Sequence, residues 1–460
     1  MGICVRCAFQ AFTINGTLAQ MPMNGGAPRE LQENVAFADW TPDSKQLAIT
    51  TAETPHRLEF PPGNVLYTSK GTGWLGEARI SPKGDRIVFV EHIYYGDDAN
   101  VSVVDLKGTK TDLTGKFPTV FGLAWTPDGN EVWFTASDDT NQRYLYAVSL
   151  ERKQRQVFRL LGALTIHDIS RDGKVLLSRE ESRMTVEFMG PGDKTSRDLS
   201  WMDWSSIDDL SADGKVLAID ESGDATEGVE GGSLVYVRKT DGSPAVRMAA
   251  KSAGRALSPD GKFLLSAVNE QNDAESAYEL LPIGPGARSQ IETGLQSLGR
   301  VAWFPDSKRI VYSARAKGGK VRTWVQPLDG KPQPLTAEGE RFVALSPEGA
   351  SVLASGPSGY VLYPSGGEAS RPVPTLRPGD VVLGFAAGGM AVYVAAKADR
   401  SRIFRLDLAS GERRMWKQLR PAEPAGVRDI QGIRITPDGQ SIAFEVYRTI
   451  SDLYLATGLK

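Results

Sequence analysis

The chain repeats one short unit along its whole length. A strand is followed by a Pro-Asp-Gly or Pro-Asp-Ser turn and a second strand, and the unit returns roughly every 40 to 50 residues. Proline presets φ near about −65°, aspartate bonds the local backbone, and glycine adopts the positive φ, with serine as a weaker substitute at Ser44 and Ser307. Because each unit of such a chain packs only on its neighbours, the period constrains the architecture.

About ten copies of this unit can be aligned. Short β-rich segments flank each turn, and third and fourth strands often follow. Four strands in a unit of about 43 residues are typical of a propeller blade. The sequence therefore predicts an all-β chain, a β-propeller of about ten four-stranded repeats, with no helix longer than two turns. The turns are expected at Pro42, Pro82, Pro127, Arg171, Ala212, Pro259, Pro305, Pro347, Ala387 and Pro437.

The repeats allow two arrangements. The first is one continuous ring over residues 1–460. The second is a pair of consecutive propellers, with about four repeats and a partial one in residues 1–200 and about six repeats in residues 201–460. A junction for the second arrangement is expected at residues 198–204, which contain Trp201 and Trp204.

Charge, cysteine content and hydropathy argue against several classes of protein and partner. The formal net charge is −3, from 53 basic and 56 acidic residues without long basic runs, so a nucleic-acid partner is not expected. Cys4 and Cys7 provide only two of the four ligands of a structural zinc site and exclude a disulfide scaffold. The N-terminus is not typical of a signal peptide. The apolar stretch 381–396 is too short and too glycine-rich for a membrane span and favours two strands around a hairpin.

Motifs of catalysis are weak or missing in the sequence. Residues 71–76 match GxGxxG, but a blade start follows where a dinucleotide site needs a helix. No GxSxG elbow is present, and His56, His92 and His167 are scattered over different repeats, which leaves little material for a catalytic triad. We therefore predict no catalytic, cofactor-binding or metal-binding residue and leave the ligand-binding residues unassigned.

Acidic and aromatic residues have structural interpretations. The loop 220–227 has the acidic spacing of a calcium loop but lacks its glycine and final glutamate, and residues 96–100 are interpreted as a solvated loop in the same way. Packing between blades is expected for the tryptophans that precede the turns. The turn itself accounts for Asp43, Asp128, Asp213, Asp260, Asp306 and Asp438.

The repeated unit and several longer segments resemble two known groups of proteins. The repeated Ser/Thr/Trp-Pro-Asp-Gly-Lys unit resembles the TolB-like (WD40-like) propeller family over nearly the whole chain. Residues 198–201, 210–215, 238–247 and 447–455 together resemble the C-terminal propeller region of bacterial transmembrane serine/threonine protein kinases. That resemblance implies an extracytoplasmic sensor region. The kinase domain and membrane helix of that family are not in this sequence, so no kinase residue is carried over.

Three functions remain open at this stage. The first is a non-catalytic binding or sensor module whose partner is a protein or a small molecule. The second is the propeller of a prolyl-oligopeptidase-like peptidase or a TolB-like scaffold for protein interactions. The third is a propeller enzyme with a metal in its channel, which would need Asp, Asn, Glu or His ligands converging on inner loops.

Overall fold

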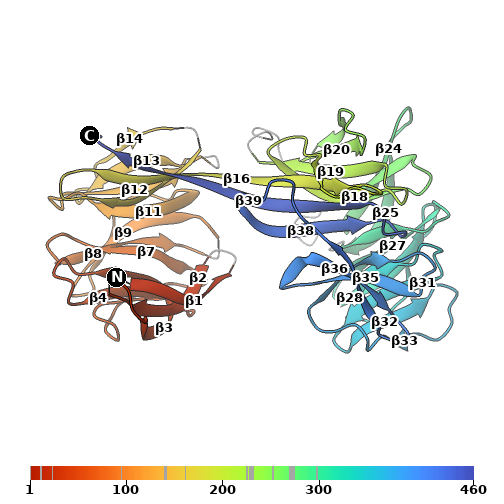
Figure 1. Cartoon of the computed structure of the whole chain (residues 1–460), viewed down its shortest axis with the longest axis horizontal. Coiled ribbons are helices and arrows are strands. Elements are labelled where there is room, and N and C mark those ends of the chain that lie inside the picture. Colours follow the sequence, from red (N-terminus) through yellow and green to blue (C-terminus); the bar gives the residue numbers. More distant parts are fainter. Residues whose placement is uncertain are drawn as a thin grey trace. The chain divides into compact units, whose positions relative to one another are not determined.

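The computed structural model describes residues 2–10, 13–22, 24–94, 96–138, 142–160, 162–223, 226, 233–250, 253–268, 275–296 and 299–459. Across these ranges the chain forms strands and turns and no α-helix. Nearly all strand pairs are antiparallel neighbours in sequence, which is the pattern of repeated four-stranded blades (Figure 1). The predicted all-β propeller architecture is confirmed.

The chain divides into two compact units. Unit 1 contains residues 1–181 and 450–460, and unit 2 contains residues 182–449. Both boundaries lie inside 15-residue strands, β16 (Val175–Met189) and β39 (Ile442–Ala456). The first boundary falls within β16, and the last residues of the chain group with the first unit, while residues 198–204 lie inside unit 2 between the pairing segments of its first two blades.

Unit 2 consists of six blades, each led by an inner strand. The first blade combines β38 (Val427–Ile435), the first half of β39, the second half of β16, and β17 (Arg197–Asp198). Each of the other five is consecutive in sequence. They are β18 (Trp204–Leu210), β19 (Val216–Ser222), β20 (Leu234–Lys239) and β21 (Val246–Ala250); β22 (Ala253–Leu257), β23 (Phe263–Val268), β24 (Glu275–Pro282) and β25 (Ser289–Gln296); β26 (Val301–Trp303), β27 (Arg309–Arg315), β28 (Val321–Pro327) and β29 (Gln333–Pro334); β30 (Arg341–Leu345), β31 (Ser351–Gly356), β32 (Gly359–Pro364) and β33 (Arg371–Pro372); and β34 (Asp380–Phe385), β35 (Ala391–Ala396), β36 (Asp399–Asp407) and β37 (Arg413–Gln418).

The six blades of unit 2 close into a ring. The inner strands contact one another in the order β18, β22, β26, β30, β34 and β38, and β38 contacts β18 again. A separate cluster of buried apolar side chains fills each of the interfaces between neighbouring blades. Burial of apolar surface on both faces of every blade therefore stabilises the ring.

Unit 1 contains a series of four blades. The first has two additional strands, so its sheet runs through β1 (Gly2–Gln10), β2 (Thr13–Gln20), β3 (Arg29–Trp40), β4 (Leu47–Thr51), β5 (Arg57–Glu59) and β6 (Val65–Thr68). The second contains β7 (Trp74–Ile80), β8 (Arg86–His92), β9 (Ala99–Asp105) and β10 (Lys110–Asp112), and the third β11 (Thr119–Trp125), β12 (Glu131–Ser137), β13 (Tyr144–Ser149) and β14 (Gln154–Phe158). The fourth pairs β15 (Ala163–Ile169) with β16.

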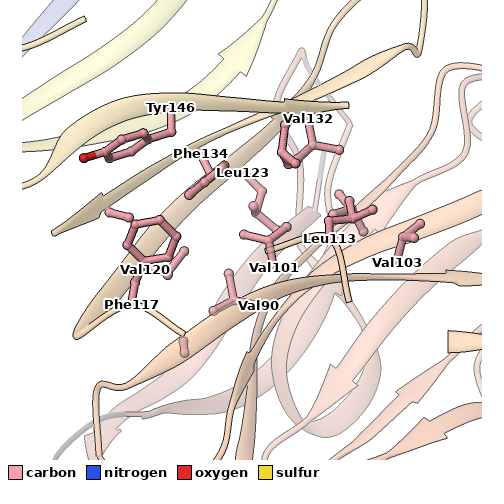
Figure 2. Close-up of a cluster of buried hydrophobic side chains, with 14 of the residues drawn as sticks. Val90, Val101, Val103, Leu113, Phe117, Val120, Leu123, Val132, Phe134 and Tyr146 are labelled. Atoms are coloured by element: carbon pink, nitrogen blue, oxygen red, sulfur yellow. The ribbon is translucent and has the colours of Figure 1, made fainter. Parts of the chain in front are cut away.

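Apolar side chains fill the spaces between successive blades of unit 1. Figure 2 shows the largest of these clusters, in which Val90 and Val101 of the second blade face Val120 and Phe134 of the third. Similar clusters join the first blade to the second and the third to the fourth. In the described part of unit 1, no such cluster joins the fourth blade back to the first, so the contacts form a line of four blades.

The turn chemistry expected from the repeat is confirmed. Glycines in these turns adopt φ between 67° and 82°, as at Gly129 and Gly388, and the substitutes Ser44 and Ser307 adopt φ of 59° and 54°. The opening Ser or Thr and the turn aspartate bond each other and the backbone, as in the 2.6 Å bond from Thr126 Oγ1 to Asp128 Oδ1. The turn aspartates are therefore structural.

Candidate functional site

The inner strands of both units share a β-bulge just before their turns. In β18 the register shifts between Ile207 and Asp209, and in β22 it shifts between Gly254 and Ala256. The same shift occurs in β11, β15, β30, β34 and β38. A bulge leaves one residue unpaired and changes the direction of its side chain. The register shifts of β18 and β22 fall at Asp208 and Arg255, so charged side chains occupy bulges on two neighbouring inner strands of the ring.

An aspartate next to the bulge joins one blade to the next. Oδ2 of Asp209 accepts a hydrogen bond from the backbone amide of Leu257 in β22 at 2.8 Å, and its Oδ1 accepts from Leu210 at 2.9 Å. Burial raises the pKa of Asp209, and these amides act in the opposite direction. Both oxygens of this carboxyl are therefore occupied by structure, which leaves Asp209 little capacity to bind a ligand.

Arg434 and Glu445 fix the junction where the ring closes. Arg434 of β38 donates from Nε to the carbonyl of Asp208 at 2.9 Å and from Nη2 to the carbonyl of Ile207 at 3.2 Å. Glu445 of β39 accepts from the amide of Ile207 at 2.7 Å. Gly432, with φ of 57°, leaves the space that the Glu445 carboxyl occupies, because a Cβ at that position would overlap it. These groups are also occupied by structure.

Two charged groups at the ring centre remain without a hydrogen bond. Oδ2 of Asp208 is buried and has no hydrogen-bond partner among the described residues. Burial raises the pKa of Asp208 well above its usual value, the neighbouring Asp220 carboxylate adds to this, and Arg255 and Arg434 oppose it. An ordinary structural carboxylate in a protein interior has a full set of donors, so Asp208 differs from Asp209 beside it.

Arg300 is the second such group. It precedes β26, and within the described ranges its guanidinium makes no hydrogen bond or ion pair. Solvent reaches its side chain, yet protein crowds it closely enough that burial, followed by the charge of Arg434, lowers its pKa to about 10 while Asp209 opposes the shift.

Asp208, Arg255 and Arg434 belong to inner strands of unit 2, and Arg300 directly precedes another. Counted back from the residue that opens each turn, they are two to four positions away, and a strand rises about 3.3 Å per residue. We call these four residues the ring-centre cluster. With a guanidinium and a carboxyl both lacking hydrogen bonds, it can accept an anionic group and a hydrogen-bond donor from a ligand. No cluster of three or more His, Cys, Asp or Glu side chains suited to a metal ion occurs among the described residues.

Unit 1 contains a second candidate, a polar cavity of about 380 Å³. Glu91 accepts from Tyr67 and Lys110, and Asp112 accepts from Lys110, from Ser102 at 2.9 Å and from Asn100 at 3.2 Å. Since its carboxylates are already bonded, this cavity has less unused binding capacity than the ring-centre cluster. Its lining is Lys70, Glu91, His92, Ile93, Asn100, Asp112, Thr114, Gly115 and Lys116.

The structure assigns most residues singled out in the sequence to the scaffold. Residues 71–73 of the GxGxxG segment lie in the connection from β6 to β7, and residues 74–76 begin β7. Trp125 and Trp303 are buried and donate from Nε1 to carbonyls of the preceding blade, at 3.0 and 3.2 Å. The stretch 381–396 forms the hairpin of β34 and β35. The acidic loop 220–227 lies partly outside the described residues.

No hydrogen bond joins the side chains of the three histidines in the described residues. His56 and His92 are buried, and burial lowers the pKa of His92 to about 3, so its ring is neutral. His167 lies 2.8 Å from Ser178 Oγ. The ring-centre residues were not singled out in the sequence, although a signal was present: charged residues stand two to four positions before a turn, inside strands that are otherwise apolar.

The described residues include no helix long and apolar enough to cross a membrane. No protein-family model matches the sequence, and no curated protein matches it.

Solved structures with a similar fold include two TolB proteins, the class that the repeat resembles. TolB from Acinetobacter baumannii is 12% identical, with 90% of this chain and 81% of that chain covered and a TM-score of 0.27. A putative TolB from Agrobacterium tumefaciens is 16% identical, with 74% and 94% covered and a TM-score of 0.28.

A third similar structure comes from a study of two prolyl endopeptidases. It is 12% identical, with 79% of this chain and 53% of that chain covered and a TM-score of 0.35, so this chain spans about half of that protein. At these TM-scores the propeller assignment rests on the strands and blades of this chain itself.

Proposed function

We propose that the chain is a non-catalytic β-propeller module that binds a ligand at the ring-centre cluster of unit 2. The observation that carries the proposal is Arg300, an accessible guanidinium without a hydrogen bond or ion pair among the described residues. Arg434, in contrast, is used for structure, with donors directed at carbonyls of its own and the adjoining inner strand. A guanidinium that crowding desolvates and no acceptor compensates is poised for an anionic group of a ligand.

The biological role we propose is that of a sensor. The resemblance to the propeller region of bacterial transmembrane serine/threonine kinases supports this role and an extracytoplasmic location. A ligand at the ring centre contacts inner strands of several blades at once, so its binding would stabilise the whole ring by mass action. A peptidase propeller or a TolB-like scaffold is the alternative, and it places the partner on the outer surface of the blades.

The proposal is tested by thermal unfolding of the full chain with a defined panel of small compounds: acetate, propionate, glutarate, glutamate, alanine, ethylamine and glucose. We expect carboxylates to raise the melting temperature of the wild-type chain and to lose this effect in Arg300→Gln. Arg309→Gln, an exposed arginine paired with Asp306 at a turn, is the matched control and keeps the response. Equal responses in both variants would contradict the proposal, and so would recovery of a chemically altered compound.

A further inference from the structure

A polar network lies beside the apolar cluster between the first two blades of unit 1. Tyr67 of β6 donates from its hydroxyl to Glu91 of β8, and Lys110 of β10 donates to Glu91 and to Asp112. Glu91 is 9% exposed, and Asn100 of β9 is 7% exposed. Burial of such groups costs free energy, which their mutual bonds only offset. Packing of the two blades alone does not account for them.

This network forms one wall of the cavity of about 380 Å³ in unit 1. Glu91, Asn100 and Asp112 line the cavity together with Lys70, in the connection from β6 to β7, and Lys116, which follows β10. Sites for small molecules typically measure about 300–1,000 Å³. Donors and acceptors therefore border one space that is large enough for a small ligand.

Two oxygens of this wall accept no hydrogen bond from the described residues. Oδ1 of Asp112 accepts from Lys110, from Ser102 at 2.9 Å and from Asn100 at 3.2 Å, whereas its Oδ2 accepts from none. Asn100 donates from Nδ2 to Asp112 and, at 2.9 Å, to Ser102, so its Oδ1 is an unused acceptor. Neither oxygen is among the buried atoms that lack a partner. Both are therefore within reach of a ligand.

The charges in and beside the cavity balance. Lys110 bonds two carboxylates, and Lys116 lies 2.8 Å from Asp98. Lys70 is exposed and makes no ion pair with the described residues. The three cations and three anions are Lys70, Lys110, Lys116, Glu91, Asp98 and Asp112. A ligand with a net charge would leave one charge uncompensated, whereas a neutral ligand keeps the balance.

We propose that this cavity binds a neutral sugar of the monosaccharide class. Its hydroxyl groups donate to Oδ2 of Asp112 and to Oδ1 of Asn100, and they accept from Lys70, because a hydroxyl can do both. Ile93 in the lining contributes apolar surface for the C–H groups of the sugar ring. The cavity belongs to unit 1, so this inference is independent of the site proposed in unit 2.

The test is a ligand-observed NMR titration of the full chain with glucose, galactose, mannose and xylose. Binding is measured directly because sugars also raise melting temperatures by exclusion from protein surfaces. We expect at least one of these sugars to bind the wild-type chain and to lose binding in Gly115→Phe. Gly115 lines the cavity, and a Cβ at this position meets nothing within 4 Å. Gly366→Phe, at an exposed glycine of unit 2 with equal space, is the matched control and leaves binding unchanged.

Two further variants test the proposed acceptors. Asp112→Ala and Asn100→Ala should each weaken the affinity about tenfold, as loss of one hydrogen bond of about 1.4 kcal/mol would give. Lys110 keeps its pairing with Glu91 in both variants, and circular dichroism shows whether each is folded. Glucuronate and glucosamine, which bear opposite charges on the glucose ring, should bind about tenfold more weakly than glucose.

Several outcomes would overturn the inference. No binding of any of the four sugars does so, and so does binding that persists in Gly115→Phe or in both acceptor variants. Tighter binding of glucuronate than of glucose, with dependence on Lys70, would assign the cavity to an anion instead. Tighter binding of glucosamine would assign it to a cation. Arg300→Gln should leave sugar binding unchanged, so these results and those for the site in unit 2 are distinguishable.

Discussion

Unit 1 and unit 2 use the same interactions between blades but differ in closure. In unit 1, Arg79 of β7 donates to the carbonyls of Leu123 and His167 at 3.2 and 3.3 Å, and Glu77 accepts from the amide of Leu123 at 3.0 Å. In unit 2, Arg434 and Glu445 do the same at the closing junction. The aspartates Asp39 and Asp209 each accept an amide of the next blade at 2.8 Å.

The difference lies in what the ring adds to these shared interactions. Each blade of unit 2 has two neighbours, whereas in the described part of unit 1 no buried apolar cluster joins the fourth blade to the first. Closure brings the inner strands around one axis and gathers charged side chains beyond those the scaffold uses. The binding site that we propose for unit 2 depends on this closure.

The largest effect is expected where unit 2 closes. Arg448 of β39 donates to Glu187 of β16, and both side chains are buried. Arg448→Met leaves a buried carboxylate without its cation, which should destabilise unit 2 by about 3–5 kcal/mol. In unit 1, Arg143 pairs with Glu180, which is half-exposed. Arg143→Met should therefore destabilise unit 1 by less than Arg448→Met destabilises unit 2. Hydrogen exchange by mass spectrometry, resolved for peptides of each unit, measures both losses.

The control for this prediction is Arg414→Met, because Arg414 pairs with Glu412 at the exposed surface. It should leave both units unchanged. Equal losses for the two buried arginines would show that closure does not concentrate stability at the junction.

Two glycines at equivalent bulges differ in the space that a side chain would have. An alanine Cβ at position 122 would overlap the backbone carbonyl of Ile166, and at position 432 it would overlap the side chain of Glu445, which could turn away only by losing its hydrogen bond from the amide of Ile207. Gly122→Ala should therefore destabilise more than Gly432→Ala, and both should exceed Gly84→Ala, where φ is 70° but nothing lies within 4 Å. Backbone strain alone costs about 1–3 kcal/mol. Urea unfolding of the three variants gives the order, and a Gly84→Ala cost as large as the others would refute the steric account.

Substitution of arginines at the inner strands should distinguish those that bond the scaffold from one that does not. Arg79→Gln and Arg434→Gln should each cost about 1–3 kcal/mol, since each leaves carbonyls without charged donors. Arg300→Gln should stay within about 0.5 kcal/mol of the wild type, because its guanidinium holds nothing in the described structure. The free energies of unfolding are compared in urea at one salt concentration. A large cost at Arg300 would mean that it is part of the scaffold.

An effect of opposite sign, a gain in stability, is expected for Asp208→Asn. A carboxyl whose pKa is raised by folding costs stability as pH rises from its unfolded value, about 4, towards its folded value. The amide variant lacks this cost, so its melting temperature should equal that of the wild type near pH 3 and exceed it by about 2–4 °C at neutral pH. Scanning calorimetry over pH measures the difference, and a gain that is constant with pH would contradict the assignment to ionisation.

The sequence predicted the blades well because their determinants are local. A turn of Ser or Thr, Pro, Asp and Gly specifies its own φ angles and hydrogen bonds within five residues, as Thr436 and Asp438 show. The ring-centre cluster could not be predicted in the same way. Asp208 and Asp209 are adjacent and chemically identical, and only the position of the next blade decides that one is bonded to an amide while the other is not.

The exit of the chain from unit 1 through β16 and its return through β39 make unit 2 an insertion within a blade. The last residues of unit 1 that pack on its apolar core, Ala456 and Leu459, are synthesised after the whole of the six-bladed ring. A nascent chain can therefore finish the inserted ring before the unit that began first is complete. Completion of the N-terminal unit therefore depends on contacts of very long sequence separation, the kind that slows folding.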